Sequence, residues 1–129
     1  MQSISPEIIF RGNYAWEKSL PQITKLTKSP LILGRGIHTN NLRNKIFIDL
    51  KNQNLKVNTA NLQFDCCYED ISRVKDIILK NNHDSVIAAG GGKVLDSGKY
   101  IADCLKIPCI TVPLSASTCA GWTALSNIY

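Results

Sequence analysis

The stretch Ser85-Val-Ile-Ala-Ala-Gly-Gly-Gly-Lys-Val-Leu-Asp-Ser-Gly-Lys99 decides the fold of this chain. It predicts a short buried strand over residues 86–89, then a turn of three glycines, and then a helix that begins at Lys93 or just after it. Apolar residues recur beyond the turn at helical spacing, at Val94, Ile101 and Leu105, and mark one face of that helix.

A strand that leads through glycines into a helix N-terminus is a common way to hold an anionic group. Glycines allow the backbone to turn sharply, and the unpaired N–H groups and the helix dipole favour negative charge. Lys93 adds a positive charge beside the turn. The spacing matches neither of the two common phosphate-binding glycine motifs, so a plain turn that lets a helix pack closely remains an equal alternative at this point.

The rest of the chain alternates strand and helix patterns around this turn. Such alternation predicts an α/β fold, a Rossmann-like parallel sheet with right-handed crossovers, followed by the start of a hairpin. The expected strands cover residues 8–10 (an edge strand), 31–33, a weakly alternating stretch over 55–62, 86–89 and 109–112. The expected helices begin near Ser19 with Pro21 in the first turn, after Thr39 or Asn40, after Asp65 or Cys66, and at the glycine turn.

Composition places the chain among folded soluble proteins. It has 129 residues, of which 44% are hydrophobic and 19% charged, enough for one domain with its own core. No apolar run approaches the length of a membrane span and no signal-peptide pattern opens the chain, so we expect a cytoplasmic protein without a membrane partner. The net charge of +5 comes from scattered basic residues without interleaved aromatic residues, which argues against a nucleic-acid partner. Five cysteines without a C-x-x-C spacing predict neither a disulfide framework nor a zinc knuckle.

The segment after Pro113 is rich in small hydroxyl residues and has no clear period. It follows the carboxyl end of a predicted strand, where open α/β sheets bind their ligands. Its hydroxyl groups can hydrogen-bond a polar ligand. A tight turn that leads into a hairpin explains the same residues.

Three segments, taken together and in order, resemble the N-terminal domain of the iron- or zinc-dependent alcohol and polyol dehydrogenases, and most closely their glycerol dehydrogenase branch. The signature Gly-Gly-Gly-Lys-x-x-Asp of that family stands at residues 90–96. Its Pro-Thr-x-Ala-Ser-Thr-Asp-Ala segment corresponds to residues 113–120, and its Ser-Ala-Leu-Ser-x-Ile-Tyr segment to residues 123–129.

The resemblance implies a dinucleotide-binding domain over residues 1–129, with the pyrophosphate of NAD or NADP at the glycine turn. The implied contacts on the phosphate side are Gly90, Gly91, Gly92, Lys93 and Asp96. The implied contacts along the rest of the cofactor are Leu114, Ser117, Thr118, Thr123, Leu125 and Tyr129. Asp96 also fits a carboxylate that the helix dipole stabilises. Thr123, Leu125 and Tyr129 also fit plain hairpin packing.

Two positions depart from the family pattern. Cys119 stands where the family has an aspartate that contacts the polyol, so this substrate position predicts an alcohol, aldehyde or ketone other than glycerol. Arg35 stands after the second strand, where the family often has an aspartate for the adenosine ribose. Because an arginine can accommodate a 2′-phosphate, Arg35 predicts a preference for NADP over NAD.

The resemblance covers only the cofactor domain of that family. Its members are two to three times longer, and their helical C-terminal domain supplies the ligands of zinc or iron, so we expect the chain to be a fragment or a truncated form that is inactive alone. His38 and His83, both expected at the surface, match none of those ligands. Two other interpretations remain: a relative of dehydroquinate synthase or of the sugar-phosphate dehydrogenases, and a non-catalytic nucleotide-binding remnant. Assembly into a homo-oligomer stays open.

Overall fold

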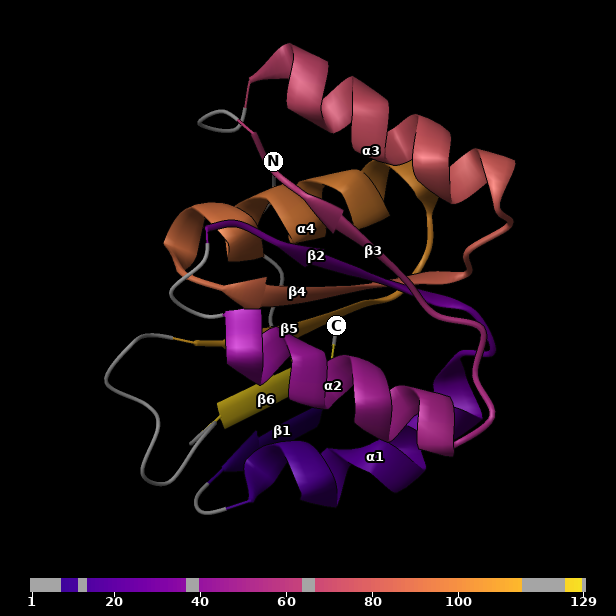
Figure 1. Cartoon of the computed structure of the whole chain (residues 1–129), viewed down its shortest axis with the longest axis vertical. Helices are drawn as coiled ribbons and strands as arrows, with labels where there is room; N and C mark the ends of the chain where they lie inside the picture. Colours follow the sequence, from indigo (N-terminus) through magenta and orange to yellow (C-terminus); the bar gives the residue numbers. More distant parts are fainter. Residues whose placement is uncertain (1–7, 12–13, 37–39, 64–66, 115–124, 129) are drawn as a thin grey trace.

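A computed structural model describes residues 8–11, 14–36, 40–63, 67–114 and 125–128 of the chain (Figure 1). Strands and helices alternate, as the sequence predicts. In chain order the elements are β1 Ile8–Arg11, α1 Ala15–Leu26, β2 Pro30–Gly34, α2 Asn40–Asn52, β3 Asn58–Asn61, α3 Tyr68–Lys80, β4 Ser85–Gly90, α4 Gly92–Leu105, β5 Cys109–Pro113 and β6 Leu125–Ile128.

The strands form one sheet in the order β1-β6-β5-β4-β2-β3. The four strands β3, β2, β4 and β5 pair in parallel, whereas β6 pairs antiparallel with both β5 and β1. After β2, the chain forms β3 on one side of β2. It then crosses β2 and forms β4 on the opposite side of β2. The direction of winding therefore reverses between β2 and β4. In open α/β sheets, ligands bind outside the carboxyl ends of the strands at such a reversal.

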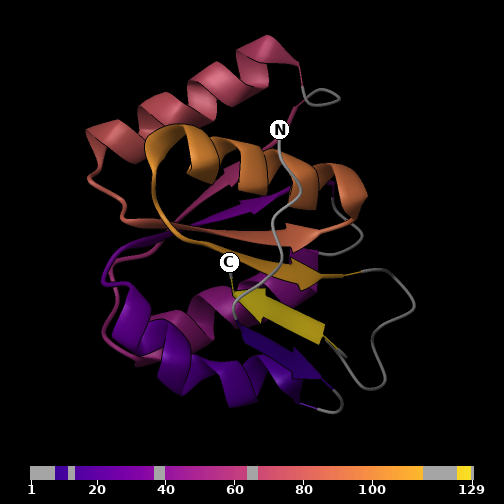
Figure 2. The ribbon, with the colours of Figure 1, turned by 180° about the vertical axis from the view of Figure 1, so that it is seen from behind.

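Helices cover both faces of the sheet. Helices α1 and α2 lie on one face, and α3 and α4 lie on the other (Figures 1 and 2). Alternate residues of β4 enter the two cores: Ile87 and Ala89 pack on the α1–α2 side, and Val86 and Ala88 pack on the α3–α4 side. All residues of β2 and β4 are buried, which explains why both read as continuous apolar runs.

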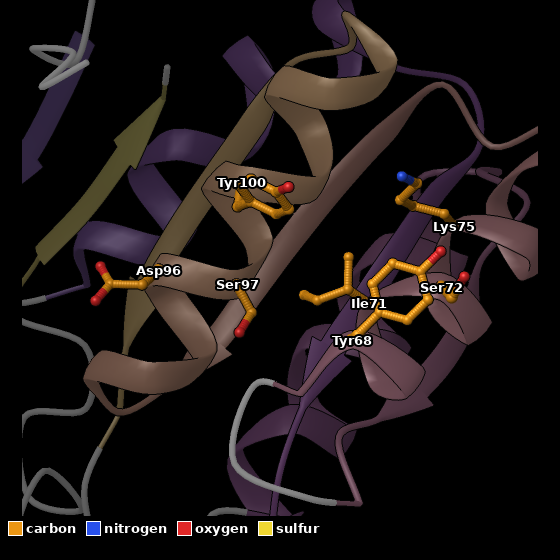
Figure 3. Close-up of a pocket in the computed structure, with 7 residues that line it drawn as sticks. All are labelled: Tyr68, Ile71, Ser72, Lys75, Asp96, Ser97 and Tyr100. Atoms are coloured by element: carbon orange, nitrogen blue, oxygen red, sulfur yellow. The ribbon is translucent and has the colours of Figure 1, made fainter. Parts of the chain in front are cut away.

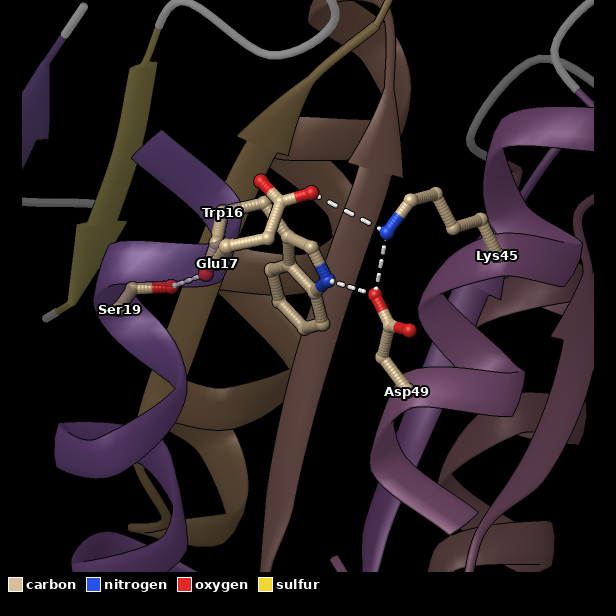
Figure 4. A network of polar contacts seen from close by, with 5 residues as sticks. All are labelled: Trp16, Glu17, Ser19, Lys45 and Asp49. Carbon is tan, nitrogen blue, oxygen red and sulfur yellow. Dashed lines mark hydrogen bonds and ion pairs between the residues drawn. The ribbon is translucent and has the colours of Figure 1, made fainter. Parts of the chain in front are cut away.

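Helix α1 begins at Ala15, so the expected start near Ser19 is wrong. Burial of its first turn is the reason: Trp16 is fully buried, and its indole Nε1 donates a hydrogen bond to Asp49 Oδ2 of α2 at 2.9 Å. Lys45 of α2 joins the two helices further, with its Nζ at 2.7 Å from Asp49 and 3.1 Å from Glu17 (Figure 4). Pro21 then falls inside the helix, on its exposed side, where water can bond the carbonyl that loses its donor.

The strand expected within residues 55–62 is shorter than its apolar pattern suggested. Strand β3 covers only Asn58–Asn61, whereas Leu55, Val57 and Leu62 are buried at its two ends. Because β3 is an edge strand that pairs with β2 alone, its own polar residues face solvent and the apolar residues anchor the connections.

Helix α4 approaches the sheet closely at one position. A Cβ atom added to Gly98 would lie 2.5 Å from the Cβ of Ala88 in β4, which is far inside van der Waals contact. The glycine that the sequence places on the inner face of this helix therefore sets the distance between α4 and β4. None of the helices in the described part of the chain is long and apolar enough to cross a lipid bilayer.

Candidate functional site

A cavity of about 340 Å³ opens between the loop after β2 and the turn after β4. The cavity lies at the carboxyl ends of β2 and β4, the two central strands between which the winding direction reverses. The cavity is lined by Arg35, Gly36, Gly91, Gly92, Lys93 and Val94. The fold thus brings Arg35 to the glycine turn, although the two segments are far apart in the sequence.

The glycine turn itself is the junction of β4 and α4. Strand β4 ends at Gly90, Gly91 is the N-cap, and α4 begins at Gly92, one residue earlier than expected. No side chain caps this helix start, so its first N–H groups lie at the cavity without an intrahelical partner. A Cβ atom added at Gly91 or Gly92 would meet no atom of the described residues within 4 Å, apart from the glycine's own neighbours along the chain. Packing therefore does not require glycine at these two positions, and the space that they leave suits the close approach of a ligand.

The electrostatic character of the cavity is positive. Arg35 is half-buried and Lys93 is exposed, and no aspartate or glutamate is among the described lining residues. The N-terminal end of α4 adds its partial positive charge. Two cationic side chains and a helix N-terminus around one space favour an anion with more than one negative charge, such as a diphosphate.

Arg43 of α2 supports this site, and the sequence analysis missed it. Its side chain is only 5% exposed and crosses Gly34, where an added Cβ would lie 2.3 Å from Arg43 Cδ. Its guanidinium donates to the carbonyl oxygens of Arg35 at 3.3 Å and Gly36 at 2.6 Å, and burial lowers the pKa of the group. A signal existed: Arg43 shares the helical period of the buried residues Ile46 and Leu50.

We predict that Arg43→Gln loosens the loop that carries Arg35. A hydrogen bond that involves a charged group contributes about 1.5–3 kcal/mol, so the free energy of unfolding should fall by at least about that amount. Hydrogen exchange at the Arg35 and Gly36 amides should quicken more than exchange in α2. Gly34→Ala, which displaces the guanidinium but keeps the charge, should give the same pattern. Lys51→Gln, at the exposed end of α2, is the control; equal exchange in all variants would contradict the role of Arg43.

Other predicted site residues lie apart from the cavity lining. Leu114 is buried in the core, and its N–H donates to Gly90 O at 2.9 Å, which ties the end of β5 to the glycine turn. The Asp96 side chain is 74% exposed and lies 3.9 Å from Lys99 Nζ, on the turn of α4 after the cavity. Leu125 begins β6. The remaining predicted residues, Ser117, Thr118, Cys119, Thr123 and Tyr129, lie outside the described residues.

His83 is buried, so its expected place at the surface is wrong. The residue is 7% exposed and lies two positions before β4, and its Nδ1 lies 3.0 Å from Ser29 Oγ. The tight connection between α3 and β4 turns the ring inwards: the N–H of His83 bonds Ile78 O at 3.0 Å. His38 lies outside the described residues. Within the described ranges, no three histidine, cysteine or acidic side chains gather in a way that could hold a metal ion.

The sequence of the chain matches known proteins. The family model of the iron-containing alcohol dehydrogenases matches residues 6–129. An uncharacterised oxidoreductase of Synechocystis is 34% identical over 98% of this chain and 32% of its own length. Glycerol dehydrogenase 1 of Schizosaccharomyces pombe is 29% identical over 97% of this chain and 28% of its own length. The chain thus spans about a third of the length of these curated relatives.

Solved structures support the same fold. The crystal structure of maleylacetate reductase from a Rhizobium strain superposes with a TM-score of 0.72, at 20% identity, over 88% of this chain and 32% of that chain. At this identity the likeness concerns the fold alone. The match of the family model covers nearly every residue and includes all three motifs. The chain belongs to the iron-containing alcohol dehydrogenase family.

Proposed function

We propose that this chain is the cofactor-binding part of a metal-dependent NAD(P) oxidoreductase that acts on a small alcohol or polyol. The observation that supports it best is the cavity at the winding reversal, where Arg35, Lys93 and two glycines without packing constraints meet. This arrangement fits a dinucleotide because it offers N–H groups, positive charge and room for close approach at one point.

Each part of the cavity has a role in this proposal. The N–H groups at the start of α4 bind the diphosphate, and the Lys93 ammonium neutralises part of its charge. Arg35, on the loop after β2, faces the adenosine ribose and favours a 2′-phosphate there. The bound cofactor supplies the hydride acceptor or donor, and the protein orients it.

Other parts of the reaction depend mostly on residues that the structure does not describe. We propose that the hydroxyl-rich loop around Ser117 and Thr118 contacts the nicotinamide side of the cofactor, together with Thr123, Leu125 and Tyr129. Cys119 would face the substrate in place of an aspartate and so favour a substrate other than glycerol. Zinc or iron, held by a helical domain of the kind found in longer family members, would polarise the substrate oxygen.

The first test is a calorimetric titration of the chain with NAD and with NADP. We expect saturable binding of at least one of them in the submillimolar to millimolar range. Absence of any binding at several millimolar cofactor, by a chain that is folded by circular dichroism, would overturn the proposed function for these residues.

Arg35→Asp tests which dinucleotide the cavity prefers. We expect wild-type protein to bind NADP more tightly than NAD, and Arg35→Asp to weaken NADP binding by about 10- to 150-fold, because a charged hydrogen bond to the 2′-phosphate contributes about 1.5–3 kcal/mol. NAD binding should change by less than about threefold. Lys80→Asp, an equal charge reversal at the exposed end of α3, controls for the net charge of the protein. Equal affinity of the wild-type chain for both dinucleotides would remove the predicted NADP preference.

A further inference from the structure

A second pocket lies between α3 and α4, on the face of the sheet opposite to α1 and α2 (Figure 3). Its volume is about 560 Å³, within the range of about 300–1,000 Å³ that is usual for small-molecule sites. It is lined by Tyr68, Ile71, Ser72, Lys75, Asp96, Ser97 and Tyr100. Among the residues that the structure describes, it shares no lining residue with the cavity at the glycine turn.

Two tyrosines give the pocket flat apolar walls from both helices. Tyr68 of α3 is 81% exposed and Tyr100 of α4 is 45% exposed, and Ile71 points from α3 towards α4 between them (Figure 3). The ring of a tyrosine can pair with another flat ring in an offset-stacked or edge-to-face arrangement. The walls therefore suit a planar aromatic group.

The charges of the pocket favour an anion. Lys75 is half-buried in the wall, and within the described ranges it makes no ion pair or hydrogen bond. Asp96 is the one acidic residue in the described part of the lining. Its carboxylate lies 3.9 Å from Lys99 Nζ and points away from Lys75 (Figure 3). The Ser72 hydroxyl, one turn from Lys75 on the same helix, can donate a further hydrogen bond.

We propose that the pocket between α3 and α4 binds a small aromatic carboxylate, with its ring between Tyr68 and Tyr100 and its carboxylate at Lys75. This proposal does not depend on dinucleotide binding. The two sites lie on successive turns of α4 and have separate lining residues.

The test uses 2-naphthoate as the probe and 2-naphthylmethanol as its neutral counterpart, titrated into the whole chain and followed by ligand-observed NMR. We expect 2-naphthoate to bind about fivefold more tightly than the alcohol, as one partly exposed ion pair allows. Lys75→Met should abolish that difference in affinity without weakening the binding of the alcohol. Tyr100→Leu should weaken the binding of both probes. Lys80→Met, on the same helix but outside the pocket, should leave both affinities unchanged.

Three outcomes would overturn the proposal. The first is equal binding of the two probes by the wild-type chain, or no binding of either. The second is an unchanged preference in folded Lys75→Met, or in Lys75→Gln if the methionine variant does not fold. The third is displacement of 2-naphthoate by saturating NADP, which would make the pocket part of the dinucleotide site. The first two outcomes are measured without any dinucleotide. They would therefore overturn the proposal for this pocket and would say nothing against dinucleotide binding at the glycine turn.

Discussion

Gly92→Ala is expected to fold as stably as the wild-type chain and to lose most of its affinity for NAD and NADP. Apart from its own neighbours along the chain, the added methyl group meets none of the described residues within 4 Å, so we expect it to cause no strain in the free protein. Alanine at the first position of a helix is also favourable, and reduced freedom of the unfolded chain should stabilise the variant by about 0.4–1 kcal/mol. The same methyl group would project into the space where, in the proposed function, the diphosphate approaches the N–H groups of α4.

The expected loss of binding follows from overpacking against a ligand. Inserting a methyl group into a close contact costs about 1–3 kcal/mol, which corresponds to about 5- to 150-fold in the dissociation constant. Calorimetric titration with each dinucleotide and thermal unfolding without ligand measure the two effects separately. Gly91→Ala, with the same open space, should give the same loss of binding. Wild-type affinity in both variants would show that the ligand does not approach the glycine turn.

In contrast to Gly92→Ala, Gly98→Ala is expected to destabilise the protein. Its added methyl group would lie 2.5 Å from the Cβ of Ala88, and neither group can rotate away because both are fixed to the backbone. Helix α4 would have to move off the sheet, and we expect the free energy of unfolding to fall by about 1–3 kcal/mol. Denaturant unfolding measures this loss.

A second substitution separates this steric effect from a general effect of alanine in α4. Ala88→Gly removes the opposing methyl group, after which the nearest remaining atoms would be Val86 Cγ1 at 3.6 Å and Ala88 Cα at 3.7 Å. The double variant should therefore recover part of the stability that Gly98→Ala loses, although Ala88→Gly alone destabilises the strand. Strict additivity of the two losses in this double-mutant cycle would contradict the proposed contact.

Local patterns in the sequence were enough for much of this fold. The apolar runs of β2 and β4 predicted buried parallel strands, and the period of Val94, Ile101 and Leu105 predicted α4 to within a residue at its start. These signals are short in range, because each depends on which residues share one face of one element. The start of α1 was missed for the opposite reason: the burial of Trp16 depends on Asp49, which lies in another helix.

The same limit applies to the candidate site. The glycine turn and Lys93 could be singled out from neighbouring residues alone, and the resemblance to the family singled out Arg35. No local pattern could show that Arg43 binds the carbonyls of the Arg35 loop, or that Asp96 is not among the described residues that line the cavity. Both facts depend on which turn of a helix faces the sheet and on how two loops meet.

The sequence by itself determined the alternation of strands and helices, the position of the glycine turn and, through three motifs, the family. Only the tertiary structure decided that the reversal of winding lies between β2 and β4 and brings Arg35 beside Lys93. Strand order arises from long-range pairing and from the burial of both sheet faces, which no window of neighbouring residues encodes. The same packing left space for a side chain at Gly92 and closed Gly98 against Ala88, so that two glycines in one helix have different surroundings.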